Sequence, residues 1–294
     1  MLALTWNVDP EILSLTIPGL GWHFGPRYYG LLFALAFLVG YHIVQWMFER
    51  EGKSIESLSS LLFHLMMGTI IGARLGHCLF YEPDYYLANP LRILEIWKGG
   101  LASHGGTIGI LVALALYARK NTDQPLGWLM DRLTVSVALT AACIRLGNFF
   151  NSEIVGKPTE LPWAIVFERL DQIPRHPAML YESVSYFVLC GVCFYLYATR
   201  IDTLKRGFLT GLLLVWIFTS RFLLEFVKEN QVAFESGLPL NMGQLLSLPF
   251  VALGILFLLG KQAPFIDWMA PRPAGKKAAQ HLPKAAKKSS KKKR

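Results

Sequence analysis

Seven long apolar segments constrain the fold of this chain more than any other feature of its sequence. They cover residues 28–48, 58–80, 101–118, 131–150, 178–199, 208–226 and 242–260. At about 1.5 Å of rise per residue, a helix of about 20 apolar residues crosses the ~30 Å hydrocarbon core of a bilayer. The chain also has 53% hydrophobic and only 17% charged residues, more apolar than a soluble domain requires. We therefore expect an all-α polytopic membrane protein with about seven transmembrane helices.

The basic residues between these segments predict the orientation. If the N-terminus lies outside, seven basic residues fall in external segments and nineteen in internal ones, eleven of them in the C-terminal tail. Lys and Arg concentrate on the cytoplasmic side of membrane proteins. We therefore expect the N-terminus outside and the C-terminus in the cytoplasm.

Composition divides the chain into three regions. Residues 1–27 are expected to form an external segment, because they lack the basic start and cleavage site of a signal peptide. Residues 28–270 form the seven-helix membrane domain. Residues 271–294 combine Pro, Ala and Lys without apolar periodicity, which predicts a disordered cytoplasmic tail. A basic tail directly after a last transmembrane helix favours anionic membrane lipids over nucleic acid, so we expect no nucleic-acid partner.

Three arginines lie within the apolar segments, where arginine is least expected: Arg74, Arg145 and Arg221. Inserting one arginine near a helix centre costs ~2.5–3.5 kcal/mol, and such residues usually face the protein interior or a water-filled cavity. A purely structural interpretation is snorkelling from a helix end, or an ion pair such as Arg221 with Glu225 one turn later. Three such arginines in one chain favour a functional site.

The stretch "CIRLGNFFNSEIVGKP" brings further polar residues to the external side. Arg145 and Asn148 are three residues apart and share a helix face, and Asn151 and Glu153 follow where the apolar segment ends. The structural alternative is that the two asparagines cap the helix and Gly156 forms a turn. With the arginines at the same membrane depth, we expect these residues to contribute to one site.

His104 stands between two glycine pairs in "GGLASHGGTIG", and Arg175 is expected at the same membrane interface. Arginine binds phosphate through paired N–H groups, and histidine is suited to accept a proton near neutral pH. Gly105 and Gly106 would let the backbone approach a ligand and offer N–H groups to an anion. These residue types together predict a phospholipid-processing site.

The stretches "GGLASHGGTIG", "RLGNFFNSEIVG", "RHPAMLYE" and "SRFLLEF", in this order, resemble the bacterial prolipoprotein diacylglyceryl transferases. The likeness extends from Tyr28 to the "NMGQLLSLP" stretch at Asn241. It implies transfer of the diacylglyceryl group of phosphatidylglycerol to the lipobox cysteine thiol of prolipoproteins, with glycerol 1-phosphate released. It also implies a multi-pass protein of the bacterial cytoplasmic membrane with its active site toward the external side. The implied partners are phosphatidylglycerol and lipobox peptides, and no cofactor or metal is implied.

The resemblance matches His104 to an essential histidine, and Arg145 and Arg221 to essential arginines. Two positions depart from it, because His77 and Ile217 stand where tyrosine is usual. Combined with the residue-level analysis, the expected substrate-binding residues are Tyr29, Gly105, Gly106, Asn148, Asn151, Glu153, Gly156, Arg175 and Glu225.

Two questions stay open at this point. His104 either accepts the thiol proton or donates a hydrogen bond to the lipid phosphate. The alternative function is a phospholipid-binding transporter or channel without catalysis, which would place polar residues along several helices rather than toward one membrane face. An intramembrane serine protease is disfavoured because the sequence contains no G-x-S-x-G motif.

Overall fold

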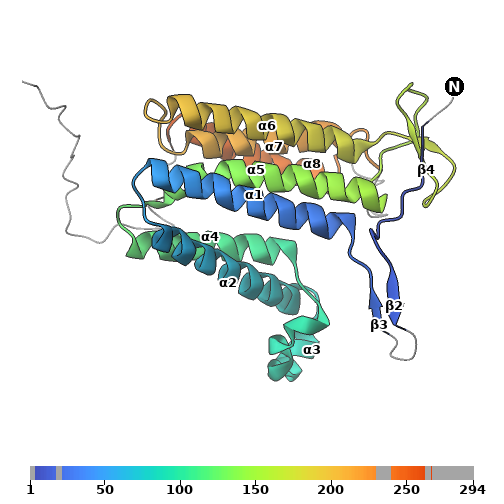
Figure 1. The fold of residues 1–294 in the computed structure, drawn as a ribbon, viewed down its shortest axis with the longest axis horizontal. Coiled ribbons are helices and arrows are strands. Elements are labelled where there is room, and N and C mark those ends of the chain that lie inside the picture. The colour runs from blue at the N-terminus through green and yellow to red at the C-terminus, as the bar shows by residue number, and fades with distance from the viewer. Residues whose placement is uncertain (1–3, 18–21, 230–239, 262–265, 267–294) are drawn as a thin grey trace, which may run out of the picture.

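The structure is a computed structural model that describes residues 4–17, 22–229, 240–261 and 266 (Figure 1). The tail expected over residues 271–294 lies outside the described residues. Each of the seven predicted apolar segments contains one helix, which confirms the predominantly helical fold. The helices are α1 (Tyr28–Arg50), α2 (Ile55–Phe80), α4 (Ser103–Lys120), α5 (Leu126–Asn151), α6 (Ala178–Arg200), α7 (Phe208–Leu224) and α8 (Met242–Leu258).

Four of these helices, α1, α2, α5 and α6, are long and apolar enough to cross a membrane, and α7 and α8 are shorter apolar helices. This agrees with a membrane protein, whereas the number of spans and the orientation stay predictions. α5 begins five residues before the predicted segment because its first turn packs into the protein, with Leu126 and Leu129 buried in an apolar cluster with Phe48 and Tyr117.

The long helices lie side by side and alternate in direction (Figure 1). α5 packs against both α1 and α6, α7 packs on α8, and α2 packs on α4. α1 and α6 begin, and α2 and α5 end, where the short β-strands lie (Figure 1). We call this the strand end. It gathers connections that the loop charges predict to lie outside.

The α2–α4 pair is held together through glycines. Gly68, Gly72 and Gly76 of α2 face Gly105 and Gly109 of α4, and a Cβ atom added at any of the five would overlap the backbone of the other helix. Small residues four apart let two helices approach closely in a membrane, where van der Waals packing drives association. The loop after α2 contains α3 (Pro83–Ala88) and the 3₁₀ helices η1 (Pro90–Leu94) and η2 (Ile96–Lys98).

Two small sheets depart from the expected all-α fold. β1 (Leu4–Trp6) pairs in parallel with β4 (Ile165–Phe167), which pairs antiparallel with β5 (Pro174–Arg175). β2 (Leu15–Ile17) and β3 (Trp22–Phe24) form an antiparallel pair. These strands have two or three residues each, too few for a periodic pattern, and the β1–β4 pairing joins distant parts of the chain. The N-terminal segment is therefore tied to the connection between α5 and α6.

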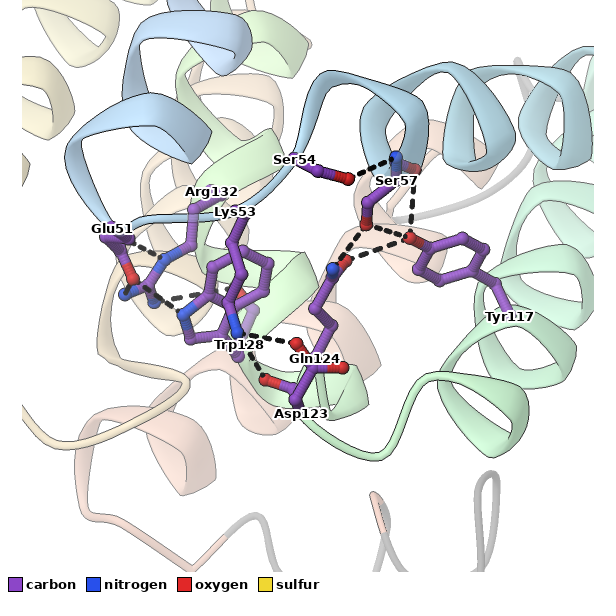
Figure 2. A network of polar contacts seen from close by, with 9 residues as sticks. All are labelled: Glu51, Lys53, Ser54, Ser57, Tyr117, Asp123, Gln124, Trp128 and Arg132. Carbon is purple, nitrogen blue, oxygen red and sulfur yellow. Dashed lines mark hydrogen bonds and ion pairs between the residues drawn. The ribbon is translucent and has the colours of Figure 1, made fainter. Parts of the chain in front are cut away.

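A polar network fixes the opposite end of the bundle (Figure 2). Glu51, which follows α1, accepts hydrogen bonds from Arg132 at 2.8 Å and 2.9 Å and from Trp128 at 2.8 Å, both on α5. Tyr197 of α6 donates to the same carboxylate at 2.6 Å. Burial alone raises the pKa of Glu51, but the bonds from Arg132, Tyr197 and Trp128 outweigh it and leave the pKa below its usual value. One carboxylate thus joins three helices.

Candidate active site

A chain of alternating charges links α5, α6 and α7 at the strand end. Nε of Arg145 lies 2.7 Å from Oε2 of Glu182, and Oε1 of Glu182 accepts a hydrogen bond from Nζ of Lys228 at 2.8 Å. Nζ of Lys228 also lies 3.6 Å from Oε1 of Glu225, and this oxygen is 3.8 Å from Nε of Arg221. The side chains of Glu182 and Lys228 are 0% and 3% exposed, so they compensate each other's charge in place of water. We call these five residues the charge chain.

The arginines at the two ends of the charge chain are more open than its middle. The side chain of Arg145 is 20% exposed and that of Arg221 is 39% exposed. Among the described residues, the guanidinium of Arg221 has no hydrogen-bond partner, and its Nε is buried. The ion pairs of the charge chain connect these two arginines although they come from different helices, α5 and α7.

Glu225 is buried at the C-terminal end of α7 and also connects to α8. Nδ2 of Asn241, the N-cap residue of α8, donates to Glu225 at 3.3 Å. Asn241 and Gln244 form a capping box that fixes the start of α8. Gly243 lies against the Glu225 carboxylate, where a Cβ atom would overlap it. The start of α8 thus holds the carboxylate that faces Arg221.

α5 ends in a strained turn that returns a carboxylate to the helix. Ser152 and Ile154 have φ angles of 56° and 58°, in the left-handed region that costs non-glycine residues free energy. The exposed Glu153 between them accepts hydrogen bonds from Asn148 at 3.0 Å and Asn151 at 3.2 Å. Asn148 also accepts a hydrogen bond from Nη1 of Arg145 at 3.3 Å. The polar residues predicted at the end of α5 therefore form one network with the charge chain.

Gly156 allows the loop after α5 to meet two other segments. Its N–H donates to the carbonyl of His176 at 2.9 Å, and its backbone also bridges to Lys228. A Cβ atom at this position would overlap His176 and the carbonyl of Val227. Any larger residue would separate Glu153's loop from the segment that carries Lys228, so this glycine shapes the site from outside it.

Arg175 is fully engaged by its neighbours. It donates through Nε and Nη2 to Asp171, and through Nη1 to Glu229 and to the carbonyl of Gly156. The hydrogen bonds with Asp171 and Glu229 raise the pKa of Arg175, and the hydrogen bond from Arg175 lowers the pKa of Asp171. The donors of Arg175 thus hold the loop before α6, and its expected substrate contact stays a prediction.

Tyr29 packs beside this network. It is the second residue of α1 and lies against Gly147 of α5, where a Cβ atom would overlap the Tyr29 ring. Within the described ranges its hydroxyl makes no hydrogen bond. Because Gly147 directly precedes Asn148, Tyr29 covers the part of α5 from which the polar network begins.

His104 lies on the α2–α4 pair instead. It is an exposed residue in the first turn of α4, and its ring centroid is 5.5 Å from that of Phe80 and 5.8 Å from that of Tyr81. Among the residues that the structure describes, it forms no hydrogen bond or ion pair with the charge chain. The predicted catalytic residues therefore occupy two parts of the strand end, with His104 on α4 and both arginines on the α5–α7 side.

The glycines that follow His104 serve helix packing. Gly105 lies against the backbone of Gly72 and Gly76, and the Gly106 N–H donates to the carbonyl of Ala102 at 3.0 Å. The structure gives Gly105 and Gly106 a packing role, and their expected anion-binding role stays a prediction. They bring α4 close to α2 and so place His104 beside the end of α2.

Arg74 is buried and structural. Its guanidinium donates to the carbonyls of Arg92, Ile93 and Gly99 at 2.7–2.8 Å, and it stacks on Tyr86 at 5.0 Å. It anchors the segment between α2 and α4, which leads to His104. Only two of the three predicted arginines thus join the charge chain.

The two departures from the family pattern have different surroundings. His77 stacks on Tyr81 with ring centroids 5.5 Å apart and lies 3.8 Å from a carboxylate oxygen of Glu82. Ile217 packs against the apolar cluster around Leu189 and Leu209. His77 therefore shares the aromatic ring of Tyr81 with His104, whereas Ile217 contributes to the core.

Glu182 and Lys228 were not among the residues predicted from the sequence. A signal for Glu182 was present, since it is the one acidic residue in the apolar segment 178–199. Lys228 follows the sixth apolar segment, where a basic residue is expected in an ordinary loop, and only the tertiary fold buries it.

Comparisons with known proteins show which family the chain resembles. The family model described as "Prolipoprotein diacylglyceryl transferase" matches residues 20–260. The chain is similar to proteins named phosphatidylglycerol–prolipoprotein diacylglyceryl transferase from three bacteria. Identity is 46% with the protein of Chloroherpeton thalassium, covering 86% of this chain and 92% of the relative, and 47% with that of Tolumonas auensis, covering 87% and 96%. It is 45% with that of Bacteroides fragilis, covering 88% and 95%.

Proposed function

The chain belongs to the prolipoprotein diacylglyceryl transferase family, and on this premise we propose that its strand end is the active site. The protein is a membrane transferase of lipoprotein maturation, and it transfers the diacylglyceryl group of phosphatidylglycerol to a prolipoprotein. Arg145 and Arg221 hold the lipid phosphate between them in this proposal. Asn148, Asn151, Glu153 and Glu225 orient the two guanidinium groups, and Tyr29 packs beside them.

One observation carries this assignment. Arg221 is 39% exposed and has no hydrogen-bond partner among the described residues, yet ion pairs tether it to Arg145 on another helix. A purely structural arginine, such as Arg74 or Arg175, has its donors occupied. An arginine with open donors and a second arginine near it suit a phosphate that accepts bonds from two sides.

The proposed reaction is a displacement at the carbon of the diacylglyceryl group that bears the phosphate. The sulfur of the lipobox cysteine forms a C–S bond with this carbon while the C–O bond to the phosphate breaks. The electron pair of that bond stays on the departing oxygen, and glycerol 1-phosphate leaves. Arg145 and Arg221 stabilise the charge that develops on the phosphate, as preorganised donors do in a site of low dielectric.

The thiol proton needs an acceptor, because a cysteine with a pKa of ~8.5 is mostly protonated at neutral pH. His104 is the proposed acceptor. Its exposed position at the start of α4 leaves its ring nitrogens open to a substrate. Its other open role is donation of a hydrogen bond to the lipid phosphate, and the substitution His104→Gln separates the two roles.

The membrane arrangement is part of the same proposal. In this proposal the seven helices of the predicted apolar segments, the shorter α7 and α8 included, span the bacterial cytoplasmic membrane. The strand end faces outside, and the basic tail lies against anionic lipids at the cytoplasmic surface. The support is the distribution of Lys and Arg in the sequence: seven fall in the connections at the strand end, and nineteen fall in the connections at the opposite end and in the C-terminal tail (Figure 1).

Purified protein mixed with phosphatidylglycerol vesicles and a lipobox peptide tests the function. We expect a peptide that gains one diacylglyceryl group in thioether linkage, with an equal amount of glycerol 1-phosphate. A peptide with Ser in place of the lipobox Cys controls for the thiol and should remain unmodified. Lipid binding or lipid movement without modified peptide would instead support the alternative, a phospholipid transporter or channel.

A further inference from the structure

We infer that Glu182 and Lys228 are positioning residues, which set the placement of Arg145 relative to Arg221. The inference rests on the proposed function, in which these arginines hold one phosphate. In this inference Glu182 and Lys228 do not contact the phosphate. They act only through the ion pairs of the charge chain.

The geometry makes Glu182 the junction between two helices and a loop. Its oxygens are divided, with Oε2 at 2.7 Å from Nε of Arg145 and Oε1 at 2.8 Å from Nζ of Lys228. Lys228 also faces Glu225, which pairs with Arg221. A shift of Glu182 would therefore move both cations that it contacts, and through Lys228 and Glu225 it would reach the second arginine.

Stability alone does not account for these charges. Burying a carboxylate and an ammonium group carries a desolvation penalty, and apolar residues of similar volume often stabilise a protein equally well or better. Glu182 at 0% and Lys228 at 3% exposure carry this penalty in full. What an apolar pair cannot do is hold a guanidinium at a fixed point through a directional, charge-assisted bond.

Net charge gives a competing explanation with different consequences. The charge chain contains three cations and two carboxylates, so it carries one net positive charge. Glu182→Gln adds one positive charge to the site, and Lys228→Met removes one. If the pair acted only through the local potential, the first change would lower KM for an anionic lipid and the second would raise it. If the pair positions the arginines, both changes lower kcat.

The test measures kcat and KM for phosphatidylglycerol with purified Glu182→Gln and Lys228→Met, normalised to folded protein. Glu182→Gln is the decisive variant, because it is isosteric and its amide oxygen can still accept the bond from Lys228. We expect kcat to fall about 10- to 100-fold in each variant while KM changes less than about threefold, as expected for misplaced catalytic groups. The matched control is the double variant Glu51→Gln/Arg132→Met, which removes an interhelical ion pair of 2.8 Å at the opposite end. It should keep kcat within about threefold of the unmodified protein.

Two results would overturn the inference. One is an unchanged kcat in Glu182→Gln, which would give the pair a structural role only. The other is an opposite shift of KM in the two variants at constant kcat, which would assign them to the local potential. Failure of the proposed function is a separate result, since the unmodified protein would then make no thioether product, or Arg221→Lys would retain full turnover.

Discussion

Replacing Arg145 or Arg221 by Lys keeps each positive charge but removes the planar pair of donors that a phosphate accepts. At Arg145, a lysine ammonium can still pair with Glu182, which the Nε atom contacts at 2.7 Å. The change gives up the bond to Asn148 at 3.3 Å and the remaining donors. At Arg221 no hydrogen bond is lost, because the guanidinium has none among the described residues. The substitutions therefore change what these residues offer to a ligand more than what they give to the fold.

The magnitude follows from these contacts. The lost bond to Asn148 is worth about 0.5–1.5 kcal/mol of stability, and Arg221→Lys should cost less. Loss of one preorganised donor to a developing anion costs about 2.7–4 kcal/mol of transition-state stabilisation, which is a decrease of about 10²- to 10³-fold in kcat. The double variant should lose less than the product of the single losses, since the two groups act on one phosphate.

The assay is diacylglyceryl transfer from phosphatidylglycerol to a lipobox peptide, with thermal unfolding of the same preparations as the measure of folding. Arg132→Lys serves as the control, because Arg132 also lies on α5 and pairs with a carboxylate, but this partner is Glu51 at the opposite end. It should retain turnover per folded molecule. Near-normal rates for both Arg145→Lys and Arg221→Lys would refute the phosphate clamp and leave the two arginines as structural ion-pair partners.

Four further predictions concern other parts of the molecule. His104→Gln keeps a hydrogen-bonding group but removes the basic nitrogen, so an acceptor role predicts lost turnover with lipid binding retained, whereas a joint loss of binding favours the phosphate-donor role. Glu51→Gln should lower thermal stability at neutral pH by about 1–3 kcal/mol. Because the folded pKa of Glu51 is lowered, its contribution is present above its usual pKa and disappears as the pH falls, so the gap between variant and unmodified protein should close in acid; a constant gap would contradict this assignment. Truncation after residue 270 should leave peptide modification largely intact. A reporter that is active only outside the cytoplasm should work when fused after residue 170 but not after residue 203. The inverse pattern would place the strand end on the cytoplasmic side and contradict the proposed orientation.

The helices could be predicted well because a long apolar helix is recognisable from the composition of a single continuous segment. Each apolar segment contains a helix, and the boundaries differ by a few residues where a buried turn such as that of Leu126 extends the helix. The strands were missed because β1 forms only by pairing with β4, more than 150 residues later in the chain. The glycines of α2 and α4 could have predicted the close α2–α4 packing, since their four-residue spacing is visible in the sequence.

The candidate site was predicted in part for a similar reason. Arg145, Asn148, Asn151 and Glu153 are neighbours in sequence, and the structure connects them as one network. Arg74 and Arg175 carry the same side chain as the two arginines of the charge chain, but their donors are occupied by backbone carbonyls and carboxylates. Residue type alone cannot distinguish an occupied guanidinium from an open one, because the partners come from distant segments.

The most direct test of the phosphate clamp is a structure of the full chain with phosphatidylglycerol bound. We expect the lipid phosphate to lie between Arg145 and Arg221, with oxygens within about 3 Å of nitrogens from both side chains. We also expect the glycerol carbon bearing this phosphate to face His104 across the strand end. A phosphate bound away from one or both arginines, with Arg221 still lacking a partner, would contradict the central claim.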